Sequence, residues 1–219
     1  MDAGREAVSG TVADMSPVQE PAGRIVLETD RMILRELTLE DLHALSRLYA
    51  DPDVRRFFPE RTLTLDETRE ELEWIIDVYY RRYGYGLWGT FERSSGELIG
   101  RCGLLPWKVV SSSPNLGLTE PDEDPSDEDR YEVEIAYLLA KERWGLGLAT
   151  EATRAIVDLA FETLDVPRLI CLVDPENRAS IEVALHAGFT VDGHVSIDDD
   201  EAFPLLSLPR ERWVNPTDV

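Results

Sequence analysis

The sequence is poor in the residues that build disulfide frameworks, metal centres and nucleic-acid surfaces. Its 219 residues include two cysteines and three histidines, and 44 acidic residues stand against 22 basic ones. Cys102 and Cys171 lie far apart in apolar stretches, so we expect buried thiols rather than a disulfide or a metal site. The formal net charge of -22 opposes nucleic-acid binding, which needs basic residues to neutralise phosphates. An acidic protein can instead attract a cationic partner such as an amine, or be acidic only for solubility.

Long apolar runs are also missing. No stretch approaches the roughly 18–20 residues that span a bilayer. The first 23 residues contain no apolar core of a secretion signal, and their small and polar residues predict a disordered leader. Residues 24–219 suffice for one domain with a sizeable core. We therefore expect a cytoplasmic protein that binds neither membranes nor nucleic acid.

Much of the acidic charge is local. The stretch "TEPDEDPSDEDR" holds seven acidic residues in the eleven positions from Thr119 to Asp129. Because proline and self-repelling charge cannot build a core, we expect a solvated, mobile insertion at about 111–129. A second run, "DDDE" at Asp198–Glu201, either draws a cationic acceptor or forms a turn.

The hydrophobic periodicity predicts a mixed sheet flanked by helices. Early helices follow the first strand, a β hairpin and a further strand occupy the middle, and strands alternate with helices toward the end. The expected strands are 32–37, two in the hairpin 86–107, 131–139, 167–174, 189–195 and 203–208, and the expected helices are 39–50, 66–83, 148–164 and 177–187.

The stretch "ERWGLGLATEA", Glu142–Ala152, lies between an expected strand and an expected helix. A helix start leaves several N–H groups without partners, and the helix dipole makes them an anion site. Glycines there remove side chains that would hold a phosphate away, and Arg143 would add charge. A tight turn is the alternative, since Gly-x-Gly alone is weak. The P-loop and dinucleotide-binding motifs are both absent.

The segments on either side of this stretch favour the anion site over the tight turn. The segments "YEVEIAYLLAKERWGLGLATEATRAIVDLAF" and "NRASIEVALHAGF" resemble the core of the GNAT superfamily of acetyl-CoA-dependent N-acetyltransferases, and the RimJ/RimL-like branch is most similar. The superfamily motif has Gln or Arg, two residues, Gly, one residue, then Gly or Ala. Here Trp144, Gly147 and Ala149 fill those places, so Trp replaces the polar residue. The resemblance covers about residues 24–195 and implies a three-layer α+β fold. It has a twisted, mostly antiparallel mixed sheet of six to seven strands and about four helices.

The resemblance also implies acetyl-CoA as the cosubstrate, without a metal. Backbone N–H groups from Leu138 to Ala140 would stabilise the oxyanion and pair with the pantetheine amides. The glycine stretch would hold the pyrophosphate, and Asn177 would bind the pantetheine arm. The expected coenzyme-binding residues are Leu138, Leu139, Ala140, Arg143, Trp144, Gly145, Leu146, Gly147, Leu148, Ala149, Thr150 and Asn177.

For catalysis, the resemblance implies direct attack of an amine on the thioester in a ternary complex. A carboxylate must then take a proton from the amine. Glu132 and Glu134 alternate with apolar residues and project to one face of their strand. A half-buried carboxylate there would have a raised pKa, which suits a base near pH 7. Glu134 matches the acidic residue of the branch and is the predicted base; a structural partner of an arginine or backbone group is the alternative.

The proton donor and the acceptor are less defined. Many relatives use a Tyr where this chain has Ala184, so we name Ser180 as the substitute, with a helix cap as the alternative. Candidate lining residues of the acceptor pocket are Phe57, Phe58, Trp88 and Trp107, with ordinary core packing as the alternative. The acceptor would be a protein N-terminus, a small amine or an aminoglycoside-like polycation, and the chain a monomer or homodimer. A catalytically silent acetyl-CoA sensor is the competing hypothesis.

Overall fold

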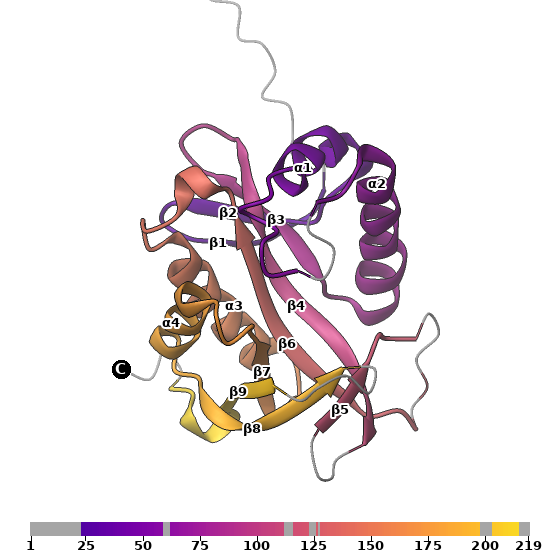
Figure 1. The fold of residues 1–219 in the computed structure, drawn as a ribbon, viewed down its shortest axis with the longest axis vertical. Coiled ribbons are helices and arrows are strands. Elements are labelled where there is room, and N and C mark those ends of the chain that lie inside the picture. Colours follow the sequence, from indigo (N-terminus) through magenta and orange to yellow (C-terminus); the bar gives the residue numbers. More distant parts are fainter. Residues whose placement is uncertain are drawn as a thin grey trace, which may run out of the picture.

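The computed structural model describes residues 23–58, 62–111, 116–122, 126, 128–197 and 203–214, which form three layers (Figure 1). Helices α1 (Leu42–Tyr49) and α2 (Leu65–Trp74) cover one face of a central sheet, and α3 (Leu148–Thr163) and α4 (Arg178–His186) cover the other. The predicted three-layer fold is confirmed. The leader 1–22 and the acidic run 198–201 lie outside the described residues. Within the described part, no helix is both long and apolar enough to cross a membrane.

The sheet has nine strands among the described residues, so the predicted number of six to seven was wrong. Their order is β1-β2-β3-β4-β5-β8-β9-β7-β6, with a further antiparallel pairing between β4 and β6. The strands are β1 (Ile25–Glu28), β2 (Met32–Arg35), β3 (Leu87–Glu92), β4 (Leu98–Ser111), β5 (Leu116–Thr119), β6 (Tyr131–Leu139), β7 (Arg168–Leu172), β8 (Thr190–Ile197) and β9 (Phe203–Pro209). The sequence did not predict β1 and β5, which have four residues each.

Strand β5 corrects the expectation of a wholly solvated insertion. It lies within the predicted acidic insertion, yet Gly117 and Leu118 are buried, and Leu118 has no exposed surface. The strand pairs antiparallel with β4 and parallel with β8. Two neighbouring strands therefore satisfy its backbone, which a short stretch followed by acidic residues does not reveal.

The second predicted helix also differs from expectation. It starts at Leu65, after a capping box between Thr64 and Glu67, but continues from Ile75 to Tyr83 as a π-helix, η2. The Tyr80 hydroxyl accepts a hydrogen bond from the Leu37 N–H (3.1 Å) and donates one to the Leu87 carbonyl (2.5 Å). This side chain holds η2 against the sheet on the face that carries α1 and α2.

Strand β6 separates two cores. Ile135 packs with the helix α3 side, whereas Leu138 packs with the cluster around α1 and α2. Since side chains alternate along a strand, Glu134 lies on the α1 and α2 face and Tyr137 on the α3 and α4 face. This alternation places two polar groups on opposite sides of one strand.

Candidate active site

The glycine stretch forms the loop between β6 and α3, and its two glycines have left-handed backbones. Gly145 has φ 72° and Gly147 has φ 76°, a conformation that side chains disfavour. A Cβ added at Gly145 would meet nothing within 4 Å, and one at Gly147 would meet only an Arg31 nitrogen at 3.6 Å. The space over the loop is therefore open, as a bound group would require.

Unpaired donors face this loop. The first hydrogen bond of α3 runs from the Glu151 N–H to the Gly147 carbonyl (3.1 Å). The N–H groups of Leu148, Ala149 and Thr150 come before it and have no partner within the helix. Together with the helix dipole, they fit the pyrophosphate of coenzyme A.

The positive side chain at the loop is Arg31, which the sequence analysis did not assign. From the turn between β1 and β2, it donates to the Leu146 carbonyl (2.8 Å) and to the Glu151 carboxylate (2.6 Å). Arg143, which was expected to add charge, instead pairs with Glu92 (3.2 Å) and Glu97 (3.4 Å) of the β3–β4 hairpin. Arg31 lies 115 residues from Leu146, so no local pattern indicates their contact.

The end of β6 offers backbone groups to the space where β6 and β7 part. The two strands pair only at Glu134 and Ile170. Ala140 donates its N–H to the Ile99 carbonyl of the neighbouring segment (2.8 Å), so this N–H is not a donor for coenzyme A. Hydrogen-bonded pairs alternate along an antiparallel ladder. The N–H groups of Leu138 and Ala140 therefore point toward β4, and those of Tyr137 and Leu139 point away, toward the gap.

Trp144 lies at the start of the loop, where the superfamily motif has a polar residue. Its indole N–H donates to the Leu139 carbonyl (2.8 Å), while 49% of the residue is exposed. The indole thus covers one acceptor on the free edge of β6 and leaves the rest of its ring at the mouth of the gap.

The far side of the gap is formed by the start of α4. The Asn177 side-chain oxygen Oδ1 accepts a hydrogen bond from the Ser180 N–H (3.2 Å) and caps the helix. The Tyr137 hydroxyl donates to the Ser180 carbonyl (2.6 Å), which ties β6 to α4 across the gap. Burial raises the pKa of Tyr137 well above its usual value, so the phenol stays protonated. Sequence reasoning missed Tyr137 because its strand position alone looks like core.

Glu134 lies where β6 and β7 part, on the face opposite Tyr137. It is 6% exposed and accepts hydrogen bonds from the Trp107 indole (2.6 Å) and the Leu172 N–H (3.3 Å). Burial raises the pKa of Glu134 to about 7, although both hydrogen bonds favour the ionised form and oppose this rise. The neighbouring Glu132 is instead paired with Arg168 (2.8 Å). Glu132 is thus a partner of an arginine, whereas Glu134 is a buried carboxylate whose raised pKa suits proton exchange near neutral pH.

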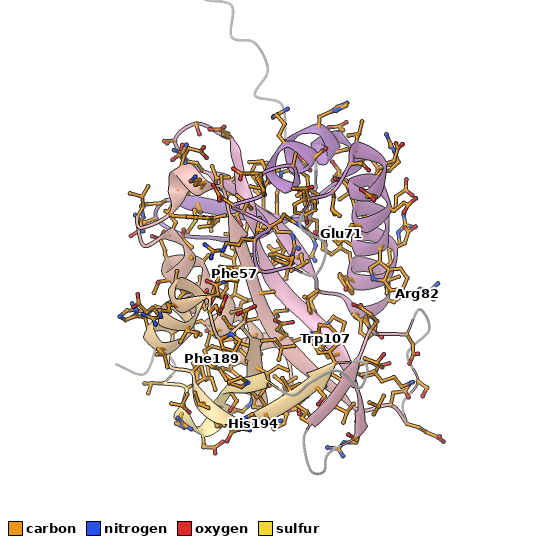
Figure 2. The ribbon with its side chains drawn as sticks, in the orientation of Figure 1. Phe57, Glu71, Arg82, Trp107, Phe189 and His194 are labelled. Carbon is orange, nitrogen blue, oxygen red and sulfur yellow. The ribbon has the colours of Figure 1, made fainter. Side chains whose placement is uncertain are left out.

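The four candidate pocket residues do not form one group. Trp107 contacts Glu134, but Trp88 is only 2% exposed and packs in the core on the α3 and α4 side. Trp88 therefore follows the alternative of ordinary core packing, because the alternation of β3 turns it away from α1 and α2. Phe57 and Phe58 are half-buried; the Phe58 ring lies under the guanidinium groups of Arg55 (4.6 Å) and Arg101 (5.8 Å). Phe57 and Trp107 are labelled in Figure 2.

A buried polar cluster joins these aromatic residues to the helices. The Tyr49 hydroxyl donates to Glu71 of α2 (2.8 Å), and Arg101 of β4 lies 3.4 Å from the same carboxylate. The guanidinium of Arg101 also acts on Glu134, lowering its pKa against the effect of burial. This cluster joins α1 and α2 to β4 on the face of the sheet that carries Glu134.

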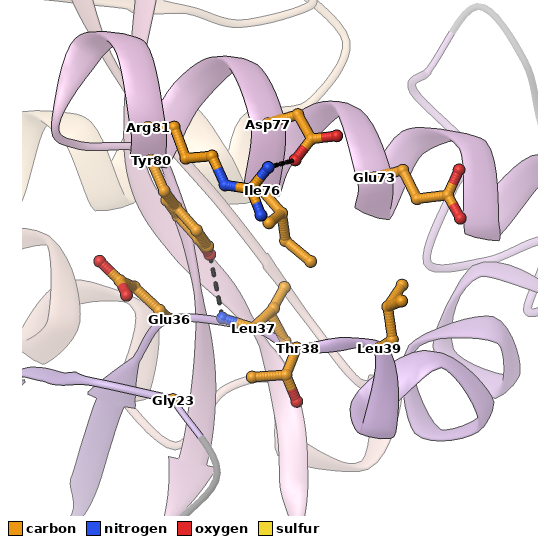
Figure 3. Close-up of a pocket in the computed structure, with 10 residues that line it drawn as sticks. All are labelled: Gly23, Glu36, Leu37, Thr38, Leu39, Glu73, Ile76, Asp77, Tyr80 and Arg81. Atoms are coloured by element: carbon orange, nitrogen blue, oxygen red, sulfur yellow. Dashed lines mark hydrogen bonds and ion pairs between the residues drawn. The ribbon is translucent and has the colours of Figure 1, made fainter.

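A groove of about 650 Å³ lies elsewhere, between the segment after β2 and the outer side of α2 and η2 (Figure 3). In it, Tyr80 bonds Leu37, and Asp77 pairs with Arg81 (2.5 Å). Its lining includes neither Glu134 nor any residue of the glycine loop. The groove and the reacting groups are therefore separate features. Over the described part of the chain, no three potential ligands gather to hold a metal ion.

The chain is similar to known proteins in both sequence and structure. Residues 31–190 match the family model described as an acetyltransferase (GNAT) domain. The chain is 32% identical to the protein YkkB of Bacillus subtilis over 74% of this chain and 83% of that protein. It is 26% identical to the spermidine N(1)-acetyltransferase of Escherichia coli K12 over 74% of each chain. The structure of AAC(6′)-Ib with ribostamycin and coenzyme A is similar, with a TM-score of 0.61, 22% identity, and coverage of 83% of this chain and 95% of that one.

These matches confirm the predicted superfamily and, with it, the enzyme class and the cosubstrate. Relatives are named N-acetyltransferases, and structural neighbours hold coenzyme A or acetyl-CoA. The chain therefore belongs to the GNAT family of acetyltransferases, the N-acetyltransferases that use acetyl-CoA.

Proposed function

We propose that this chain transfers the acetyl group of acetyl-CoA to a primary amine by direct attack, with Glu134 as the general base. The observation that carries the proposal is a buried carboxylate with a pKa of about 7 at the point where β6 and β7 part. When bound, acetyl-CoA supplies an acyl group activated as a thioester. The glycine loop, Arg31 and the first turn of α3 hold its pyrophosphate, and the outward N–H groups of Tyr137 and Leu139 bind its amides and acyl oxygen.

Glu134 removes the proton that an ammonium acceptor must lose before its nitrogen can form the new C–N bond. As the C–S bond breaks, the departing thiolate needs a proton. The Ser180 hydroxyl is the donor that the sequence predicts, and the Tyr137 phenol, which donates to the Ser180 backbone carbonyl, is a second candidate. After the attack the nitrogen carries one proton more than the amide product, and release of that proton restores the donor. Trp107 and the Leu172 N–H keep the Glu134 carboxylate oriented during the transfer.

Three classes of acceptor fit this mechanism. Relatives include a spermidine acetyltransferase, and a structural neighbour binds the aminoglycoside ribostamycin. A small amine, an aminoglycoside-like polycation and a protein N-terminus all present the primary amine that the mechanism needs. The cytoplasmic location and the monomeric or dimeric state stay predictions.

The test is release of coenzyme A thiol by the purified chain across a panel of amines and peptides. We expect turnover with at least one acceptor, and a loss of about a hundredfold or more in Glu134→Gln with acetyl-CoA binding retained. Glu132→Gln is the matched control, because it changes the neighbouring acid of the same strand. Binding of acetyl-CoA without turnover of any acceptor would contradict the proposal and favour a sensor.

A further inference from the structure

Strand β5 closes part of the sheet into a ring. It pairs with β4 through Val109 and Leu118, and with β8 through Leu116 and Val195. Strand β8 pairs with β9, β9 with β7, β7 with β6, and β6 with β4. Among the described residues these six strands thus form an uninterrupted circuit, whose lower part is seen where β8 reaches β5 (Figure 1). A closed circuit leaves no free strand edge at this end.

Side chains fill the interior of this ring. Leu118, Ile170, Val195 and Leu205 come from four of its strands, and each has at most 2% of its surface exposed. We call these four residues the ring floor. Small closed sheets are generally filled by their own side chains and leave no channel. An acceptor therefore cannot pass through the ring to reach the reacting groups.

The ring floor lies directly behind the predicted base. Trp107 and Leu172 both pack against the ring floor. The same two residues hold Glu134, through the indole N–H of Trp107 and the backbone N–H of Leu172. The ring floor consequently limits how far an acceptor can extend beyond Glu134.

The segment that follows β5 is tied to the helical side of the site. The Lys108 ammonium lies 2.5 Å from Asp122 and 2.9 Å from Asp129. The Tyr83 hydroxyl, at the end of η2, donates to the Asp122 carbonyl (2.9 Å). These contacts join the segment after β5 to β4 and to the end of η2.

From this arrangement we propose that β5 restricts the acceptor to a compact small-molecule amine and excludes the N-terminus of a protein. The inference rests on the proposed function. A polypeptide acceptor needs a free strand edge or an open groove leading past the base, and β5 occupies the edges of both β4 and β8 at this end. A short amine needs only to bring its nitrogen to Glu134.

The test compares acceptors in the full chain and in a variant that opens the ring floor. We measure kcat/KM at saturating acetyl-CoA for spermidine, a series of short alkylamines, and a short peptide with a free N-terminus. The unchanged chain should prefer the best small amine over the peptide by roughly a hundredfold. Leu118→Ala removes side-chain volume behind Trp107, and should raise the relative rate for longer alkylamines or the peptide by about tenfold.

Leu208→Ala is the matched control, since Leu208 is also buried but packs on the α3 and α4 side. It should lower stability similarly and leave the acceptor ratio unchanged. Leu116→Ala, at a half-buried position of β5, replaces Leu118→Ala if that variant does not fold. Efficient acetylation of the peptide by the unchanged chain, or an unaltered ratio in the β5 variants, overturns the inference while leaving the proposed function intact. Failure to acetylate any acceptor overturns both.

Discussion

The coenzyme side and the acceptor side of the site are built from different chemical groups. On the coenzyme side, the groups that face the ligand are backbone N–H donors at the free edge of β6 and the start of α3, next to two bare glycines. On the acceptor side, the groups are side chains held by other side chains, such as Glu134 by Trp107 and Phe58 under two arginines.

This difference has consequences for function. Backbone donors depend on the path of the chain, so many side chains can surround them without altering what they bind. Side-chain sites depend on which residues pack together, and a single substitution can change their charge, shape or pKa. We therefore expect coenzyme binding to be broken mainly by occupying the loop, and acceptor chemistry to be altered by exchanging individual residues.

The largest effect should come from filling the glycine loop. In Gly147→Glu, a carboxylate would stand where the pyrophosphate is expected, and like-charge contact costs several kcal/mol. We predict that the affinity for acetyl-CoA, measured by calorimetry, falls by at least about a hundredfold. Gly84→Glu is the matched control, because Gly84 has a similar φ of 77° and open surroundings at the end of η2, away from the glycine loop. Equal losses in the two variants would assign the effect to backbone strain or charge rather than to the site.

The same contrast explains what the sequence could predict. The helix start and its glycines form one continuous stretch, so local spacing indicated the loop and the unpaired donors of Leu148 to Thr150. Strand alternation placed Glu134 on a face, but its pKa depends on Leu172 and Trp107, which lie in other strands. Trp88 and Trp107 look alike in sequence, yet one is core and the other contacts Glu134. Arg31 and β5 were missed because their partners are distant along the chain.

Stability should respond to Glu134 in a pH-dependent way. The Glu134 carboxyl has a pKa of about 7 in the folded protein, above its ordinary 4.5. Below pH 4.5 it is protonated in the folded and in the unfolded state, so its burial as a charge does not destabilise the protein there. As pH rises from 4.5 to 7, the destabilisation grows to at most about 3 kcal/mol and then stays constant. Glu134→Gln removes this ionisation. Its amide has one oxygen to accept from the two N–H donors of Trp107 and Leu172, so the gain in stability is smaller than about 3 kcal/mol. We predict a melting temperature several degrees higher than the unchanged chain at pH 8, and no such gain at pH 4.5.

This prediction separates Glu134 from its neighbour. Glu132→Gln breaks the ion pair with Arg168, so it should not stabilise the protein at pH 8. If the melting temperature of Glu134→Gln exceeded that of the unchanged chain equally at both pH values, the fold would not disfavour the ionised Glu134 carboxylate.

A smaller effect is expected at Arg31, a charged side chain that supports the coenzyme side of the site. Arg31→Ala removes the guanidinium beside Gly147 and its bonds to Leu146 and Glu151. We predict about a tenfold weaker affinity for acetyl-CoA, or roughly 1.4 kcal/mol, with a weaker dependence of that affinity on salt. Arg93→Ala is the control, since Arg93 is exposed and pairs with Glu28 near the same turn but does not reach the loop. An unchanged affinity of Arg31→Ala for acetyl-CoA would mean that the backbone N–H donors bind the pyrophosphate without help from Arg31.

The smallest effect distinguishes the two tryptophans. The Trp107 indole donates to the Glu134 carboxylate and so favours its charged form. In Trp107→Phe this donor is lost, the pKa of Glu134 rises, and the acid limb of the kcat/KM profile should move to higher pH. Trp88→Phe makes the same change in the core on the opposite face, and should leave that limb in place. A limb that is unmoved in Trp107→Phe, or that moves equally in both variants, would mean that Trp107 does not tune the base. A selective shift would show that acceptor-side chemistry depends on one side-chain contact.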